Sequence, residues 1–191
     1  DGAVLASGAG IIDGGGGIDL LNYEGYSTLN GVDVDLLAKT ATGTSGVYNI
    51  ENVFGGRGND VLRGDDGNNV LRGYEGNDVI DGRGGVNTLD ESWATVDLVI
   101  DLWINVPQLT GLDIDTILNI QNLITGSGND ILGSSDADNI LNGGNGNDTY
   151  RFRDYFGKDT ILDSGGSDTI DFSLAALDLV FNLKAAASVS Q

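Results

Sequence analysis

The sequence contains neither cysteine nor histidine among its 191 residues. The chain can therefore form no disulfide framework and no zinc site built on these ligands. A serine or cysteine catalytic triad that relies on histidine is excluded for the same reason. A protein that folds outside the cell without disulfides needs another source of stability, and a bound metal ion is the obvious candidate.

Basic residues are also scarce, because nine Lys and Arg stand against 29 Asp and Glu and give a formal net charge of −20. Nucleic-acid binders present basic surfaces, and anionic membranes attract basic segments, so neither is expected as a partner. No signal peptide and no apolar run of membrane-spanning length is found. Since the sequence starts at Asp1 and stops within a new repeat, we expect it to be part of a longer protein.

Glycine is abundant, with 31 residues against a single proline, which favours many tight turns over long helices. Four nine-residue units follow one another without a gap over residues 55–90 and begin at Gly55, Gly64, Gly73 and Gly82. Each resembles the pattern glycine, glycine, any, glycine, any, aspartate, any, large apolar, any. A short fixed period of this kind predicts a solenoid.

A second array begins at Thr125 and continues with units at Ser134 and Gly143. Phe152 and Arg153 are two extra residues before units at 154–162 and 163–171, which keep the glycine, acidic and apolar places. Near the amino terminus, residues 14–22 fit the pattern, and residues 5–13 form a degenerate unit. The number of units in register makes chance matches in a glycine-rich chain a poor explanation.

The residue types of the unit suit calcium. Glycine permits positive φ and a close approach of the backbone to an ion. The sixth-place aspartate is a hard oxygen ligand. The last three places are extended, with the apolar eighth residue pointing inward. Two units make one coil of 18 residues, so Asp60 is expected to face Asp78, and the two carboxylates would repel each other without a cation between them.

With these repeats the chain resembles the RTX (repeats-in-toxin, haemolysin-type calcium-binding) family of secreted bacterial proteins. The resemblance implies an all-β fold, a parallel β-roll (a right-handed calcium-binding β-solenoid) whose modules are joined by β-strand capping inserts. It also implies several Ca²⁺ ions between stacked turns. One turn supplies the carbonyls of its second and fourth places and its acid, and the next turn supplies the carbonyls of its first and third places and its acid.

Four ligand sets follow when this scheme is carried onto the matching positions. The first comprises Gly56, Gly58, Asp60, Gly73, Glu75 and Asp78. The second comprises Gly126, Gly128, Asp130, Gly143, Asn145 and Asp148. The third comprises Gly144, Gly146, Asp148, Asp163, Gly165 and Asp168, and the two-residue insertion affects its geometry. The fourth comprises Asp65, Gly67, Asn69, Gly82, Gly84 and Asn87.

The fourth set is expected to be weaker or empty, because Asn69 and Asn87 carry no charge, and Asn139 with Asp159 is a similarly weakened pair. An alternative role applies to each sixth-place residue, since Asp and Asn also form turns by bonding their own backbone.

Segments between the arrays resemble one another and define a longer repeat of alternating β segment and glycine–aspartate roll. We expect residues 1–22 to end a first β-roll, 23–54 to form a β insert or cap, and 55–90 to form a β-roll. Residues 91–124 are then a second insert, 125–173 a β-roll, and 174–191 the start of a third insert. Strands are expected at 96–102 and 177–183. Tyr23, Tyr26, Phe54, Trp93 and Trp103 are expected to pack over the roll ends, with sugar stacking as their alternative use.

The leading functional hypothesis is a non-catalytic, extracellular calcium-binding region. It would fold on binding Ca²⁺ outside the cell and act as folding switch and structural spacer of a type I-secreted protein. Its partners would be calcium and the neighbouring domains of the parent chain. The alternative is a calcium-dependent carbohydrate-binding or adhesin module, with polysaccharide as the partner. An enzyme that uses two carboxylates is a third class, but the repeat already accounts for nearly all well-placed acids.

Overall fold

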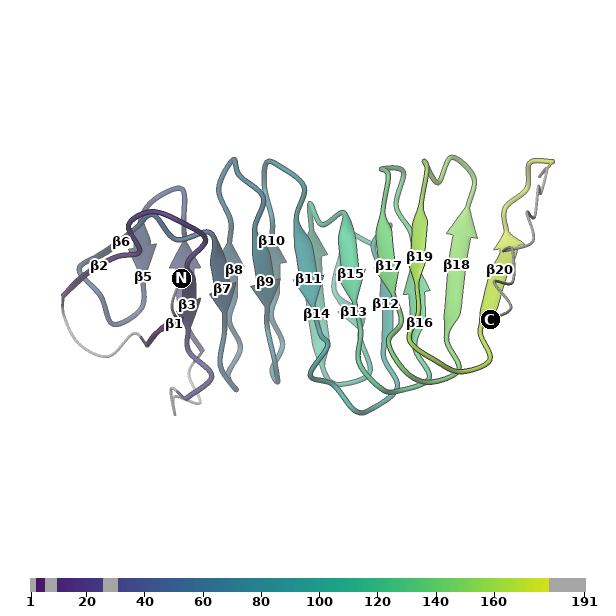
Figure 1. The fold of residues 1–191 in the computed structure, drawn as a ribbon, viewed down its shortest axis with the longest axis horizontal. Coiled ribbons are helices and arrows are strands. Elements are labelled where there is room, and N and C mark those ends of the chain that lie inside the picture. Colours follow the sequence, from purple (N-terminus) through teal and green to yellow (C-terminus); the bar gives the residue numbers. More distant parts are fainter. Residues whose placement is uncertain (1–2, 6–9, 26–30, 179–191) are drawn as a thin grey trace, which may run out of the picture.

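The computed structural model describes residues 3–5, 10–25 and 31–178, and these form twenty short strands and no helix. Accordingly, no helix that could cross a membrane occurs in this part of the chain. Figure 1 shows the strands side by side along one long axis, and the colour changes from purple at one end to yellow at the other, with β5 and β6 lying beyond β1 and β3 at the purple end. The all-β, parallel β-roll prediction is confirmed. Tyr26, part of the unit at 5–13 and most of the expected strand at 177–183 lie outside the described residues.

One sheet runs along the whole solenoid, whereas the opposite side is divided into three smaller sheets. The long sheet contains, in spatial order, β1 (Ala3–Leu5), β3 (Leu20–Asn22), β7 (Asn52–Phe54), β9 (Val70–Arg72), β11 (Thr88–Asp90), β15 (Asn122–Ile124), β17 (Ile140–Asn142) and β19 (Thr160–Leu162). On the opposite side, the first sheet pairs β2 (Ile11–Asp13) with β6 (Gly46–Tyr48). The second sheet contains, in spatial order, β13 (Gln108–Leu109), β14 (Ile114–Leu118), β10 (Val79–Asp81), β8 (Val61–Arg63), β4 (Asp33–Asp35) and β5 (Thr40–Ala41). The third sheet contains β12 (Val99–Asp101), β16 (Ile131–Gly133), β18 (Thr149–Arg153) and β20 (Thr169–Leu174).

The nine-residue period explains both the short strands and their stacking. Three extended residues close each unit, and the eighth place points into the core, as it does at Leu62, Leu71 and Leu132, which are fully buried. Parallel pairing joins units that lie two repeats apart, so Val61 lies beside Val79 and Ile131 beside Thr149. Stacked apolar residues of this kind supply the hydrophobic stabilisation of the solenoid.

Each insert contributes strands that pair with the roll before it and with the roll after it. In the first insert β4 pairs with β8, and β6 pairs with β2. In the second insert β12 pairs with β16, and β14 pairs with β10. Each insert therefore forms one enlarged coil of the solenoid. At this coil one sheet of the opposite side ends and the next sheet starts.

The expectation that the aromatic residues pack over the roll ends is wrong for Phe54 and Trp93. Phe54 lies on β7, in the interior of the long sheet, and its ring centroid is 6.3 Å from that of Tyr74. The Tyr74 ring is in turn 5.1 Å from that of Trp93, and the guanidinium of Arg72 lies 4.2 Å above the Phe54 ring. The cluster covers the flank of the coil rather than its end, because the inserts continue the solenoid.

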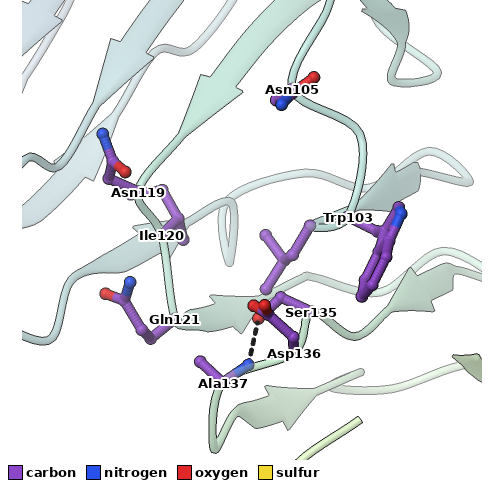
Figure 2. A pocket seen from close by; sticks show the side chains of 9 residues that line it. Trp103, Asn105, Asn119, Ile120, Gln121, Ser135, Asp136 and Ala137 are labelled. Atoms are coloured by element: carbon purple, nitrogen blue, oxygen red, sulfur yellow. Dashed lines mark hydrogen bonds between the residues drawn. The ribbon is translucent and has the colours of Figure 1, made fainter. Parts of the chain in front are cut away.

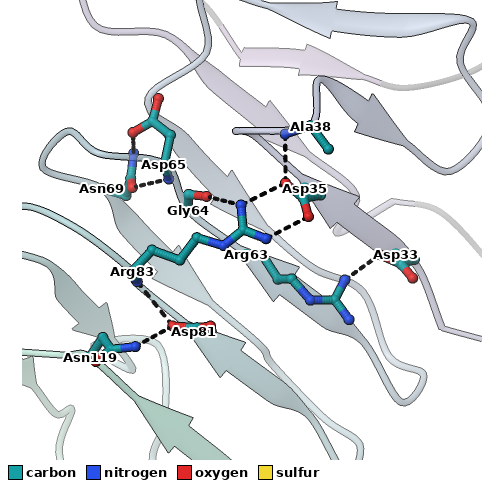
Figure 3. Close-up of polar contacts among 10 residues, drawn as sticks. All are labelled: Asp33, Asp35, Ala38, Arg63, Gly64, Asp65, Asn69, Asp81, Arg83 and Asn119. Atoms are coloured by element: carbon teal, nitrogen blue, oxygen red, sulfur yellow. Dashed lines mark hydrogen bonds and ion pairs between the residues drawn. The ribbon is translucent and has the colours of Figure 1, made fainter.

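Several arginines connect coils that are distant in sequence, and Figure 3 shows the best-defined example. Arg83 donates to both carboxylate oxygens of Asp35, at 2.8 and 2.6 Å, and to the carbonyl of Gly64 at 3.1 Å. The guanidinium lowers the pKa of Asp35 by this hydrogen bonding. The ion pair therefore fastens the first insert to the roll that follows it.

Replacing Arg83 by alanine should lower the free energy of unfolding by about 1 kcal/mol, because the bidentate pair is only partly exposed to solvent screening. Urea denaturation in the presence of calcium measures the change. Arg57→Ala is the matched control, since Arg57 is exposed on its turn and should give a smaller effect. Equal losses in the two variants would show that Arg83 contributes no more than an unpaired surface charge.

Candidate metal centres

The turns before the strands of the opposite side carry a ladder of stacked aspartates. Asp60 donates its backbone N–H to Oδ1 of Asp78 at 2.7 Å, and Oδ1 of Asp60 accepts the N–H of Val32 at 2.7 Å. Both aspartates are buried, with 1% and 2% of their surface exposed. The structure thus brings together the two acids of the first predicted site.

The second array repeats this arrangement and, among the described residues, leaves four buried side-chain oxygen atoms without partners, two of them on the stacked aspartates. The N–H of Asp130 donates to Oδ1 of Asp148 at 2.8 Å. In the described part of the chain, Oδ2 of Asp130 and Oδ2 of Asp148 are buried and accept no hydrogen bond. A buried acceptor without a partner costs about 1–3 kcal/mol. A cation between the turns would remove this cost, so the residues present fit Ca²⁺.

The third predicted site tolerates the two-residue insertion. The N–H of Asp148 donates to Oδ1 of Asp168 at 3.1 Å across a separation of 20 residues instead of 18. The register shifts between Arg151 and Arg153, where β18 pairs with β20. Carboxylate oxygens of Asp148, Asp163 and Asp168 all lie within 4.8 Å of one another. These three side chains form the most compact acidic group in the ladder.

Glycines allow backbone carbonyls to approach the same gaps. A Cβ atom added to Gly146 would lie 1.8 Å from the carbonyl oxygen of Gly128, and one added to Gly144 would lie 2.0 Å from that of Gly126. Gly144 and Gly146 also have positive φ angles of 83° and 134°. The second-place and fourth-place carbonyls of one turn therefore face the next turn. Carbonyl and carboxylate oxygens are the ligands that Ca²⁺ prefers.

The middle turns on the other side of the solenoid carry amides in place of acids, and we call this the amide side (Asn69, Asn87, Gln121 and Asn139). Acids remain in its outer turns, at Asp19, Glu51 and Asp159, and Oδ2 of Asp159 is buried without a hydrogen-bond partner in the described part of the chain. Asn69 donates its N–H to Oδ1 of Asn87 at 2.9 Å, which copies the aspartate geometry. The amide NH₂ groups donate to backbone carbonyls, as Asn69 does to Glu51 at 2.7 Å and Asn139 to Gln121 at 2.7 Å. These NH₂ groups thus satisfy the backbone carbonyls by hydrogen bonding, so that no cation is needed there.

Sequence reasoning missed two features of the ladders. Fifth-place asparagines bond in the opposite direction, since Asn77 donates its N–H to Oδ1 of Asn59 at 2.9 Å. The second insert also supplies a sixth-place acid, because the N–H of Asp78 donates to Oδ1 of Asp115 at 2.8 Å. The recurrence of Asn at the fifth place could have indicated the first feature. Around Asp115 only the second-place glycine, Gly111, is kept, so the repeat pattern did not mark this acid.

Burial shifts the titration of the stacked acids. It raises the pKa of Asp78 to about 9, and the charges of Asp60, Asp115 and Glu91 contribute to this rise. Burial likewise raises the pKa of Asp148 to about 6 and that of Glu91 to about 8. In the fold without bound ions, these carboxyl groups therefore lose their protons less readily than in the unfolded chain.

Calcium-free protein should become more stable as the pH falls from 8 to about 5. A carboxyl group whose folded pKa lies above its unfolded value stabilises the fold while it is protonated, and this stability is lost as the pH rises through the folded pKa, about 6 for Asp148 and about 9 for Asp78. The folded fraction in a chelator, measured by circular dichroism at several pH values, shows the trend. With calcium present the trend should reverse, because ligands must be deprotonated. Stability that rises with pH in the chelator would contradict this expectation.

The structure places the predicted glycines and acids on stacked turns, while their role as ligands stays a prediction. Residues 54–89 and 120–150 match the protein-family model described as the RTX calcium-binding nonapeptide repeat (4 copies). These segments include the Asp60–Asp78 step and the Asp130–Asp148 step. No curated protein was found to match the chain.

Proposed function

Because this chain carries RTX calcium-binding nonapeptide repeats, we propose that it is a β-roll region that folds when Ca²⁺ binds outside the cell. The observation that supports this most strongly is the pair of buried, unpartnered carboxylate oxygens at Asp130 and Asp148. Such oxygens oppose folding without a cation and favour it with one. Calcium would then decide whether the solenoid forms.

The proposed ions lie along the aspartate ladder at three steps: Asp60 with Asp78, Asp130 with Asp148, and Asp148 with Asp163 and Asp168. The proposal leaves the step from Asn69 to Asn87 without an ion, since the amide groups already satisfy the facing carbonyls. Each ion at ten times its dissociation constant would contribute about 1.4 kcal/mol. Several ions along one cooperative solenoid would together produce a folding switch.

In the parent protein the region would act as a structural spacer and stabiliser for neighbouring domains, without a catalytic role of its own. Each insert and the roll after it would form one module, with module boundaries near residues 22, 90 and 173 and the change from insert to roll near residues 54 and 124. A low calcium concentration inside the cell would keep the chain unfolded for type I secretion, and the higher concentration outside would fold it. The high negative charge supports this order of events, because self-repulsion opposes compaction until cations bind.

Far-ultraviolet circular dichroism during a calcium titration tests the proposal. The β signal should be weak in a chelator and should appear with a midpoint of roughly 0.1–1 mM, as in other extracellular calcium modules. Magnesium at the same ionic strength is the control, because it demands a smaller octahedral site. An identical β signal in chelator and in calcium would refute the switch.

A further inference from the structure

A polar hollow of about 430 Å³ lies on the amide side, at the junction of the second insert with the following roll (Figure 2). Trp103 and Asn105 come from the loop after β12, and Asn119 and Gln121 from the bend between β14 and β15. Asp136 comes from the turn between β16 and β17. Three segments far apart in sequence therefore form one concave surface of the size that small-molecule sites have.

The lining combines one exposed aromatic ring with uncharged hydrogen-bonding groups. Trp103 is 46% exposed, and Figure 2 shows it across the hollow from Asn119 and Gln121. Asn119 is held by a 2.7 Å bond to Asp81, and Gln121 by accepting the N–H of Asn87 at 2.8 Å. The side chains of Asn105 and Asp136 make no hydrogen bond within the described part of the chain.

The charges of the lining residues determine which kinds of ligand the hollow can bind. Among the residues that the structure describes, no basic one lines it, and Asp136 is its only ionisable group. An anionic ligand would therefore meet repulsion, which the overall charge of −20 would increase. A neutral ligand that offers hydroxyl groups to the amides and an apolar face to the indole fits these contacts. Neutral pyranose sugars have this chemistry.

The turn that forms the floor departs from the metal-binding pattern. Ser134, Ser135 and Ala137 stand at the first, second and fourth places, where the repeat has glycine. A turn that departs from the glycine pattern thus lies beside a hollow of about 430 Å³.

The first insert contains a smaller version of the same hollow. It measures about 190 Å³, and its lining combines Tyr48 and Asn49 with three charged residues, Lys39, Glu51 and Asp65. Asn49 and Asn119 occupy equivalent bends, with φ angles of 52° and 54°. Tyr48 is 39% exposed, with the ammonium group of Lys39 5.3 Å from its ring centroid. The strands β7 and β15 that follow these bends are three strand spacings apart, roughly 14 Å.

We propose that the amide side of the solenoid binds a neutral oligosaccharide, with one subsite at Trp103 and a second at Tyr48. The pyranose ring stacks on the indole, while Asn105, Asn119 and Asp136 bond its hydroxyl groups. The repetition of the hollow along the solenoid axis suits a linear chain of sugars. This function is separate from calcium-dependent folding, which supplies only the folded scaffold.

Isothermal titration calorimetry in saturating calcium tests the proposal with cellohexaose, maltohexaose and mannohexaose as probes and hexagalacturonate as the acidic comparison. At least one neutral probe should bind, more tightly than hexagalacturonate. Trp103→Ala should weaken that binding by about tenfold or more, and Tyr48→Ala should weaken binding of the hexaose but not of the matching disaccharide. Quenching or a shift of tryptophan fluorescence should accompany binding and be absent in Trp103→Phe.

Val86→Ala is the control, because Val86 is 51% exposed and lies outside both hollows. Circular dichroism in calcium confirms that each variant is folded, so that loss of binding is not loss of structure. Asn105→Ala, which removes no internal hydrogen bond, gives a second measure of the main subsite. The proposal is overturned if the folded protein binds none of the neutral probes, prefers the acidic one, or binds equally well without the Trp103 indole.

Discussion

Replacing Asp148 by asparagine is expected to weaken the calcium-bound fold and to stabilise the calcium-free fold. Oδ1 of Asp148 accepts the N–H of Asp130 at 2.8 Å, whereas Oδ2 is buried without a partner among the described residues. Asparagine keeps the accepting oxygen and removes the buried charge. Its NH₂ group can donate to a carbonyl of the preceding turn, as that of Asn139 does to Gln121.

The two effects should be of similar size and opposite sign. Asp148 belongs to two successive proposed steps, so the loss with calcium at ten times its dissociation constant is about 3 kcal/mol. The gain in a chelator is about 1–3 kcal/mol, the cost of the unpartnered acceptor. Urea denaturation in calcium measures the first change, and the folded fraction in a chelator, measured by circular dichroism, shows the second. Asp66→Asn is the control, since it removes one exposed charge outside the ladder. A shift of the same sign under both conditions would contradict a metal role for Asp148.

Replacing Gly146 by alanine should destabilise the second roll by about 3 kcal/mol or more, because the new Cβ has no room and the backbone is strained. The added atom would lie 1.8 Å from the carbonyl oxygen of Gly128, and φ at this residue is +134°. The stacked turns would have to separate, which would also displace the carbonyl from the gap between the acids. The loss should therefore be larger with calcium than without it.

Gly16→Ala provides the matched control for this substitution. A Cβ on Gly16 would meet no atom within 4 Å, and its φ is not in the left-handed region. Thermal unfolding in calcium should show a large decrease in melting temperature for Gly146→Ala and little change for Gly16→Ala. Similar melting temperatures for the two variants would mean that the close stacking of turns does not determine stability.

The repeat arrays could be predicted because each position of the nonapeptide has a separate physical task. Leu71 and Leu132 are buried as their eighth-place position requires, and Asp60 stacks on Asp78 as the 18-residue coil requires. The amides at Asn69 and Asn87 were recognisable as replacements for acids. Their geometry adds that the NH₂ group of Asn87 bonds the carbonyls of Gly84 and Asn119.

The inserts were harder to read from sequence, because their residues acquire a role only through pairing with distant coils. Asp115 continues the aspartate ladder through its bond with Asp78, 37 residues away. Phe54 and Trp93 gather around Tyr74 on the flank of the coil rather than at an end. The hollow at Trp103 likewise depends on three separate segments, and no local pattern marks such a surface.

Anomalous diffraction from crystals grown in calcium chloride would show whether calcium lies between the stacked acids, because it locates calcium without reference to the protein contacts. Anomalous density is expected between the turns at the Asp60–Asp78 and Asp130–Asp148 steps and beside Asp163 and Asp168. No anomalous density is expected between Asn69 and Asn87. Density absent from the aspartate steps, or equally strong at the asparagine step, would contradict the claim that calcium between stacked acids holds this solenoid together.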